Sequence, residues 1–245
     1  ANWEMGIMNK DEWQAKWISS AAFNMEEWKL PSPLFRKEIQ IQKNIKKARA
    51  YISGLGYYEL YINGSKIGDH VLSPNQTNYD RQKVEKWSEP RIGNMTTTVL
   101  YETFDITSAL KTGENAFGII LGNGWYIQSD RPDDTMLWYD TPRLIAQFDI
   151  EYEDSTKEII KSDENWKSDS GPILYNGLHT GEIYDARLEQ KGWNEAGFDD
   201  SKWQNSVTVR PPTGILKAQV SPPDHVTQTI KPVSVTQPEK GIYRF

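Results

Sequence analysis

The chain has 245 residues, with 28 basic and 34 acidic side chains and no cysteine. This length is sufficient for one large or two modest domains with a buried core. The formal charge of −6 argues against a nucleic-acid partner, because nucleic-acid binders carry a basic stripe. The lack of cysteine excludes disulfide scaffolds, cysteine nucleophiles and thiolate metal sites. No window approaches the roughly 18 apolar residues of a membrane span, so we expect no membrane partner.

Alternation of apolar and polar residues dominates the chain and predicts strands with one buried face. Residues 10–17 are the best candidate for a short helix. Residues 35–42 alternate, and so do residues 58–62, which run into Asn63-Gly64, a dipeptide typical of a tight hairpin turn. Residues 143–153 alternate over their whole length, and no stretch longer than about ten residues keeps a helical period. The sequence therefore predicts an all-β fold with short helical turns.

Prolines divide the chain near its C-terminal end. Pro211-Pro212 and Pro222-Pro223 are close together, and proline cannot donate a hydrogen bond within a central strand. We interpret residues 1–29 as an N-terminal lead-in and residues 30–210 as a β-sandwich. Residues 211–245 are interpreted as a linker and the first strands of a second, truncated β-sandwich domain.

Five motifs carry a family resemblance. Residues 104–115 (FDITSALKTGEN) resemble a sequence motif of galactose-binding-like jelly rolls, which occur in many glycoside hydrolases. The other four occur in this order: WQAKWI (13–18), GLGYYELYING (54–64), LGNGWY (121–126) and GEIYDAR (181–187). Together they resemble the N-terminal region of bacterial α-L-rhamnosidases of glycoside hydrolase family 78. The resemblance covers nearly the whole chain.

The resemblance implies a jelly-roll β-sandwich that acts as a non-catalytic accessory region, similar to a rhamnose-binding carbohydrate-binding module. The family's general acid and base belong to an (α/α)₆ catalytic domain that would follow Phe245, so we expect no catalytic residue here and no hydrolysis by this chain alone. The implied parent is an inverting α-L-rhamnosidase, and the implied partners are a rhamnose-containing glycan and the parent's catalytic domain. The compartment stays open, with a bacterial periplasmic or extracellular location favoured over the cytoplasm.

Two segments have the composition of a sugar site. Proteins bind sugars through aromatic rings that stack on C–H faces and through polar side chains that contact hydroxyl groups. Asn123, Trp125 and Tyr126 lie in a glycine-flanked loop, and Trp138 lies in the long connection 127–142. Long loops at the rim of a sandwich are where binding tends to occur. The alternative is that Trp125 and Tyr126 pack within the sandwich and that Asp130, Asp133 and Asp134 of the long connection are solvated.

The GEIYDAR motif is the second candidate, because Glu182, Asp185 and Arg187 surround a tyrosine. In the rhamnose-binding module that the motif resembles, a Ca²⁺ ion held by an Asp-Asn step bridges to the sugar. Asp185 aligns with that Asp, but Ala186 replaces the Asn, and losing one oxygen from a site of about six to eight ligands weakens Ca²⁺ binding. No cofactor is therefore required, and Asp185 is the candidate Ca²⁺ ligand. The structural alternative is an ion network that ties the loop to the sandwich.

The remaining tryptophans are interpreted as structural. Trp17, Trp166, Trp193 and Trp203 each lie near a turn, where a large ring can close the end of a thin sandwich. Two further functions stay open beside glycan binding or support of the catalytic domain. One is a spacer without a ligand, and the other is an accessory domain of a different glycoside hydrolase, because jelly rolls serve many functions.

Overall fold

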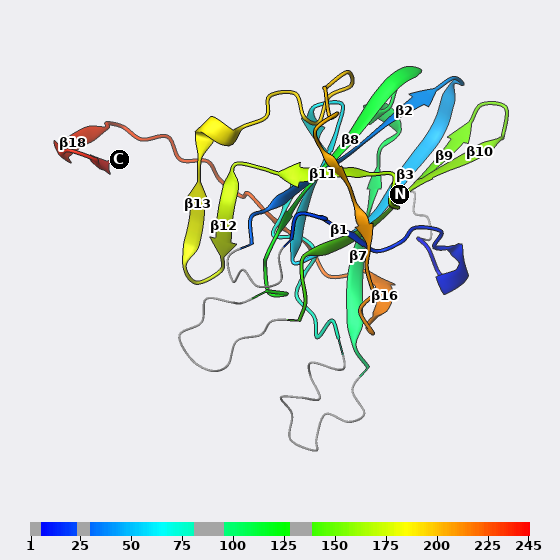
Figure 1. Cartoon of the computed structure of the whole chain (residues 1–245), viewed down its shortest axis with the longest axis horizontal. Coiled ribbons are helices and arrows are strands. Elements are labelled where there is room, and N and C mark those ends of the chain that lie inside the picture. The colour runs from blue at the N-terminus through cyan, green and yellow to red at the C-terminus, as the bar shows by residue number, and fades with distance from the viewer. Residues whose placement is uncertain (1–5, 24–29, 81–95, 128–138) are drawn as a thin grey trace.

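The alternating segments form two facing β-sheets in the computed structural model (Figure 1). The structure describes residues 6–23, 30–80, 96–127 and 139–245. Within these residues the larger sheet has seven strands in the order β15-β1-β9-β3-β7-β16, with β10 also paired to β9. Its strands are β1 (Ile18–Ser19), β3 (Ile45–Leu55), β7 (Thr98–Asp105), β9 (Arg143–Tyr152), β10 (Lys157–Lys161), β15 (Val207–Thr208) and β16 (Ile215–Ala218).

The second sheet has six strands in the order β14-β11-β2-β8-β4-β5, again within the described residues. Its strands are β2 (Pro33–Ile41), β4 (Tyr57–Ile62), β5 (Ser65–Lys66), β8 (Gly113–Gly122), β11 (Lys167–Ser170) and β14 (Gln204–Asn205). Three two-stranded pairs complete the described fold: β12 (Ile173–Gly177) with β13 (Gly181–Tyr184), β6 (His70–Val71) with β17 (Asp224–His225), and β18 (Thr236–Glu239) with β19 (Ile242–Arg244). The all-β prediction is confirmed.

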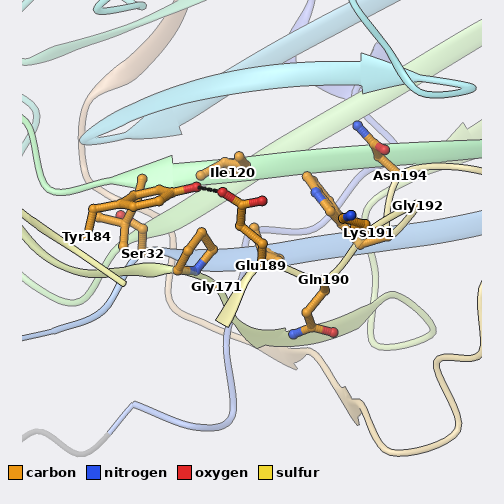
Figure 2. Close-up of a pocket in the computed structure, with 13 residues that line it drawn as sticks. Ser32, Ile120, Gly171, Tyr184, Glu189, Gln190, Lys191, Gly192 and Asn194 are labelled. Atoms are coloured by element: carbon orange, nitrogen blue, oxygen red, sulfur yellow. Dashed lines mark hydrogen bonds between the residues drawn. The ribbon is translucent and has the colours of Figure 1, made fainter. Parts of the chain in front are cut away.

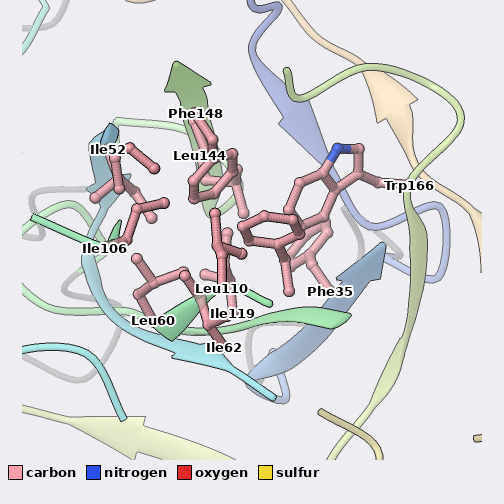
Figure 3. Close-up of a cluster of buried hydrophobic side chains, with 14 of the residues drawn as sticks. Phe35, Ile52, Leu60, Ile62, Ile106, Leu110, Ile119, Leu144, Phe148 and Trp166 are labelled. Carbon is pink, nitrogen blue, oxygen red and sulfur yellow. The ribbon is translucent and has the colours of Figure 1, made fainter. Parts of the chain in front are cut away.

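The core lies between the two sheets, where apolar side chains from both layers interdigitate (Figure 3). The face of 143–153 that the alternation marks as apolar is fully buried there, through Leu144, Ala146, Phe148, Ile150 and Tyr152. Trp166 is 0% exposed and stacks on Phe148, with ring centroids 6.2 Å apart. Phe117 of the opposite sheet approaches Phe148 to 4.3 Å. These rings connect the two layers at the centre of the sandwich.

The predicted turns and short helices also appear. Asn63 and Gly64 have φ values of 50° and 83°, so they form the left-handed corner that the Asn-Gly dipeptide predicts between β4 and β5. Helical structure in the described residues is limited to three 3₁₀ turns, η1 (Lys10–Glu12), η3 (Thr107–Ala109) and η4 (Ala186–Leu188). The predicted helix over 10–17 is thus a single turn. No helix of the described residues is both long and apolar enough to cross a membrane.

The sandwich extends beyond the predicted limits of 30 and 210. At the N-terminal side β1 joins the larger sheet between β15 and β9. At the C-terminal side β16 pairs in parallel with β7, and Arg210 and Thr213 both contact the buried carboxylate of Asp80 at 2.9 Å. Residues 224–245 are all exposed, and the β18–β19 hairpin lies apart from the sandwich (Figure 1). That this hairpin begins a second domain stays a prediction.

The central ring cluster leads to a stability prediction. Trp166→Ala should lower the free energy of unfolding by about 3–5 kcal/mol, because it opens a cavity between the sheets. Trp166→Phe should cost less, since it keeps a ring against Phe148 and loses mainly the indole hydrogen bond to the Lys161 carbonyl, 2.9 Å long. Urea unfolding of both variants measures the two losses. If both variants lost the same free energy of unfolding, packing of the Trp166 ring against Phe148 would not account for its contribution to stability.

Candidate functional site

The outer face of β8 positions the site. Phe117, Ile119 and Leu121 point into the core, so Gly118, Ile120 and Gly122 point outward. Two segments cover this outer face. The covering loop (residues 189–200) lies over Gly118, where an added Cβ atom would stand 2.9 Å from the Trp193 ring. The covering hairpin (β12–β13) lies over Gly122, where an added Cβ would stand 3.2 Å from Asn176 Oδ1.

Between the two covers a half-open pocket of about 310 Å³ remains over Ile120 (Figure 2). Its floor is Ile120 of β8 and Leu34 of β2, which are directly opposite each other in the antiparallel register. Pro172 and Ile173, at the start of the covering hairpin, form an apolar side. The pocket therefore exists because two glycines let the covers come close to the sheet, while the residue between them stays uncovered.

The covering loop forms the polar side of the pocket, with Glu189, Lys191, Asn194 and the half-buried ring of Trp193. Tyr184 of β13 also lines the pocket, next to the apolar side, because it is the register partner of Ile173. The Tyr184 hydroxyl donates a 2.7 Å hydrogen bond to Glu189 Oε1, which raises the pKa of the tyrosine (Figure 2). Rings, a carboxylate and an amide thus meet above an apolar floor.

A buried arginine holds the covering loop on the sheet. The side chain of Arg36 on β2 is 1% exposed, and its guanidinium forms ion pairs with Glu38 and Asp200. It also donates to the carbonyl of Trp193 at 2.9 Å and to the carbonyl of Glu195 at 3.0 Å. A buried charge is tolerated only when it is paired and its donors are satisfied, so the loop must stay closed over Arg36.

Two further contacts fix the loop where it lines the pocket. The Gln190 side chain donates to Asp169 Oδ2 at 3.0 Å and accepts from Trp203 Nε1 at 3.0 Å. Gly192, with φ of 76°, provides a left-handed corner between two tight turns, because the Trp193 amide donates to the Gln190 carbonyl and the Glu195 amide to the Gly192 carbonyl. The polar side of the pocket is therefore held by the fold.

The covering hairpin is held by Asn176. Its Oδ1 accepts from the Asn123 amide at 2.8 Å, its carbonyl accepts from Asn123 Nδ2 at 2.7 Å, and its Nδ2 donates to Ser32 Oγ at 2.8 Å. The rings of Trp125 and His179 meet edge to face, 6.0 Å apart. The structure thus brings the LGNGWY loop and the segment before GEIYDAR together at one end of the sandwich.

Most of the LGNGWY residues lie inside. Asn123 is 1% exposed, and Tyr126 is 0% exposed, stacked on Tyr139 with its pKa raised by burial. Neither side chain has a face open to a ligand, so these contacts support packing, which was the alternative to sugar binding. Trp125 is half-buried and contacts the same cluster. Trp138 lies outside the described residues. The sugar-binding role of these residues stays a prediction.

The charged residues of GEIYDAR lie on the exposed part of the hairpin. Both carboxylate oxygens of Asp185 accept from the Arg187 guanidinium, at 2.8 and 2.5 Å, which lowers the pKa of Asp185 and raises that of Arg187. Glu182 is exposed on β13 and, within the described residues, forms no ion pair with Arg187. The expected ion network is thus a local Asp185–Arg187 pair.

The surroundings of Asp185 do not fit a Ca²⁺ ion. Ca²⁺ takes about six to eight oxygen ligands, but both oxygens of this carboxylate already bind Arg187. Among the residues that the structure describes, no group of three or more His, Asp or Glu side chains could hold a metal. We therefore derive no role for Ca²⁺, and its binding stays a prediction.

The pocket residues were missed from the sequence, and the structural tryptophans were partly anticipated. Trp17, Trp166 and Trp203 are buried, whereas Trp193 is half-buried and lines the pocket. Leu34, Glu189, Lys191 and Asn194 lie in segments with no recognisable sugar-site motif. The one available signal was the spacing Gly118, Ile120, Gly122, which places two gaps around a side chain on one strand face.

Comparison with known proteins identifies relatives along almost the whole chain. The model of the α-L-rhamnosidase N-terminal domain family matches residues 43–228. An α-L-rhamnosidase of Formosa agariphila is 34% identical over 262 residues, which cover 97% of this chain and 26% of that protein. The chain thus spans about a quarter of the length of this relative.

Solved structures give the same result. An α-L-rhamnosidase from Dictyoglumus thermophilum has a TM-score of 0.80 at 42% identity and covers 97% of this chain and 26% of its own. An α-L-rhamnosidase of Aspergillus terreus has a TM-score of 0.83 at 32% identity, covering 98% of this chain and 26% of its own. The α-L-rhamnosidase of Streptomyces avermitilis, solved with L-rhamnose, has a TM-score of 0.73 at 32% identity, covering 88% and 20%.

Arg36 provides a test of how the covering loop is held. Arg36→Met should lower the free energy of unfolding by about 1–3 kcal/mol, because it leaves the Trp193 and Glu195 carbonyls of the covering loop without their donor. Lys16→Met is the control, since the exposed Lys16–Glu164 pair should contribute below about 1 kcal/mol. Urea unfolding gives both values, and hydrogen exchange of residues 193–198 reports whether the loop opens. Unchanged exchange in Arg36→Met would contradict the anchoring role.

Proposed function

Because the chain belongs to the α-L-rhamnosidase N-terminal domain family, we propose that it is a non-catalytic accessory region that binds rhamnose-containing glycans in the pocket over Leu34 and Ile120. The observation that carries this proposal is the pocket's composition, an apolar floor beneath a side of rings, a carboxylate and an amide. Hydrolysis is assigned to the remainder of a longer α-L-rhamnosidase, since this chain spans about a quarter of its relatives. A periplasmic or extracellular location, where such glycans would be met, is part of the proposal.

The pocket's chemistry suits a sugar residue. A sugar ring presents C–H groups that pack on aromatic and aliphatic surfaces, and hydroxyl groups that need hydrogen-bond partners. The floor and the rings of Tyr184 and Trp193 provide the first kind of surface. Glu189, Lys191 and Asn194 provide acceptors and donors. The volume of about 310 Å³ is at the lower end of the roughly 300–1,000 Å³ of small-molecule sites, which favours a single terminal sugar residue.

Binding is better supported than hydrolysis. Glycoside hydrolysis uses two carboxyl groups about 5–10 Å apart on either side of the scissile bond. Among the described residues that line the pocket, Glu189 is the only carboxylate, and it already accepts the Tyr184 hydroxyl. The solved relative from Streptomyces avermitilis contains L-rhamnose, which supports testing this sugar first.

The alternative function, a spacer without a ligand, is favoured by the packing of the LGNGWY loop. Tyr126 and Asn123 are buried, and the hydrogen bonds that Asn123 donates to Asn176 hold the hairpin to the sandwich. A ligand site at the hairpin's exposed part would instead use Trp125, Glu182, Asp185 and Arg187. The experiment must therefore separate the pocket, the exposed part of the hairpin and no binding at all.

Isothermal titration of the 245-residue chain with L-rhamnose, into the tens of millimolar, tests the proposal. Saturable binding is expected, with Glu189→Gln weakening it about ten-fold because a charged acceptor is lost. Glu182→Gln is the matched control, because Glu182 is exposed like Glu189 but lies on the covering hairpin and does not line the pocket. Its affinity should equal that of the unmodified chain. Repeating the titration with CaCl₂ and with EDTA reports any contribution of Ca²⁺.

Each alternative gives a different result. Weakening by Glu182→Gln with none by Glu189→Gln would move the site to the exposed part of the hairpin. An affinity for L-rhamnose that is higher with CaCl₂ than with EDTA would support Asp185 as a metal ligand. No saturable heat with L-rhamnose or a rhamnoside polymer would contradict glycan binding and leave the spacer function.

A further inference from the structure

We propose that the outer face of the larger sheet carries a second binding site, a groove over β3, β9 and β10 that takes a neutral sugar. This inference goes beyond the proposed function, because the groove lies on the other sheet from the pocket over Leu34 and Ile120 and shares no lining residue with it. It follows from how the groove is bounded, from two charged side chains outside the local ion pairs, and from the balance of charge along the lining.

The groove lies on side chains that point away from the core. Ala50 of β3 and Phe148 of β9 point into the core, so the residues next to them on each strand point outward. Arg49 of β3 and Ile159 of β10 are both register partners of Asp149 on β9, and all three line the groove. The groove is half-open and has a volume of about 220 Å³. Its central lining residue is therefore Asp149.

The N-terminal lead-in bounds one end of the groove. Tyr51 lines the groove and is the register partner of Gln147. The Gln14 amide donates to Gln147 Oε1 at 2.7 Å, and the Trp13 ring meets the Tyr51 ring edge to face, with centroids 6.5 Å apart. The lead-in thus covers the sheet next to Asp149, so the groove is a bounded hollow and not an open stretch of sheet.

Asp149 is an acceptor in need of a donor. Its Oδ1 accepts from Gln147 Nε2 at 3.1 Å, and within the described residues its half-buried carboxylate forms no ion pair, because Arg49 pairs with Asp105 at 2.7 Å instead. Burial raises the pKa of Asp149 despite the bond from Gln147. A carboxylate that has lost water in this way is stabilised by a ligand that donates hydrogen bonds, such as a hydroxyl group.

Lys157 provides a donor near this acceptor. It is exposed on β10 and is the register partner of Glu151, but Glu151 pairs with Lys46 at 2.6 Å. In the part of the chain that the structure describes, no carboxylate lies within ion-pair distance of Lys157. The half-buried Ile159 lies two residues along the same strand face. An acceptor, a donor and an aliphatic surface are therefore neighbours, and a sugar ring needs contacts of all three kinds.

The charges along the groove cancel, which favours a neutral ligand. Three basic and three acidic side chains line it: Lys47, Arg49, Lys157, Asp149, Glu151 and Glu158. An anion or a cation would therefore meet repulsion as well as attraction in this groove. A hydroxyl group both donates and accepts, so a neutral polyhydroxylated ligand can use both kinds of charged group.

Backbone amide NMR titrations of the 245-residue chain test the proposal, because they report the groove and the pocket separately. L-Rhamnose and D-glucose are the neutral probes, D-glucuronate is the anion, and D-glucosamine at about pH 6.5 is the cation. With at least one neutral sugar, amides of residues 147–151 and 157–161 should shift saturably in the tens of millimolar. Both charged probes should bind the groove at least about three-fold more weakly than the tighter neutral sugar.

Asp149→Asn tests the central residue. It keeps the shape and the oxygen that accepts from Gln147 but removes the charged acceptor, so it should weaken binding in the groove by about five-fold to ten-fold. Because burial disfavours the charge of Asp149, the variant should stay folded, which thermal unfolding checks. Asp163→Asn is the matched control, since Asp163 is also a half-buried aspartate with a side-chain amide donor but lies outside the groove. Its affinity should equal that of the unmodified chain.

The outcomes separate this inference from the proposed function. Shifts at residues 189–194 with none in the groove for either neutral sugar would overturn the inference and leave the pocket standing. Shifts in the groove alone would support the inference and contradict binding in the pocket. A charged probe that binds the groove as tightly as the neutral sugars would overturn the ligand class. A folded Asp149→Asn chain with unchanged affinity would overturn the assignment of the site.

Discussion

The buried guanidinium of Arg36 is the interaction on which the outer half of this structure depends. An arginine on the outer face of a sheet would normally be solvated, but here the covering loop lies over it and removes water. Once water is excluded, the charge needs Glu38 and Asp200, and its donors need the carbonyls of the loop. The same bonds that satisfy the arginine hold Trp193 above Gly118 and so fix one side of the pocket.

Glycines also determine how closely the loops approach the sheet. Gly118 and Gly122 let the covering loop and the covering hairpin approach β8. Gly56 lets the LGNGWY loop approach the backbone, because a Cβ atom at Gly56 would stand 1.9 Å from the Asn123 carbonyl oxygen. Close backbone approach therefore explains Gly56 of the GLGYYELYING motif.

The fold could be predicted because the signals that define it are local. Alternation identified the buried face of β9, and Asn63-Gly64 identified the corner between β4 and β5. The site could not be predicted, because burial of an outer face depends on segments far away in the sequence. Arg36 looks like a solvent-facing residue in 35–42 until residues 193–200 cover it, and Asn176 has no signal of its own. Aromatic composition pointed to Trp125 and Tyr126, although aromatic residues in such a sandwich also fill the interior.

The parallel pairing of β16 with β7 has a consequence for how the chain acquires its structure. Residues 98–101 of β7 can form their outer hydrogen-bond ladder only after residues 215–218 of β16 have been synthesised. In the same way, β1 can pair with β15 only after residues 207–208 have been synthesised. During synthesis the larger sheet therefore has unpaired margins until nearly the whole segment has left the ribosome, and such margins invite intermolecular pairing. Because these contacts span more than a hundred residues, formation of the complete sheet should be slow compared with that of its local hairpins.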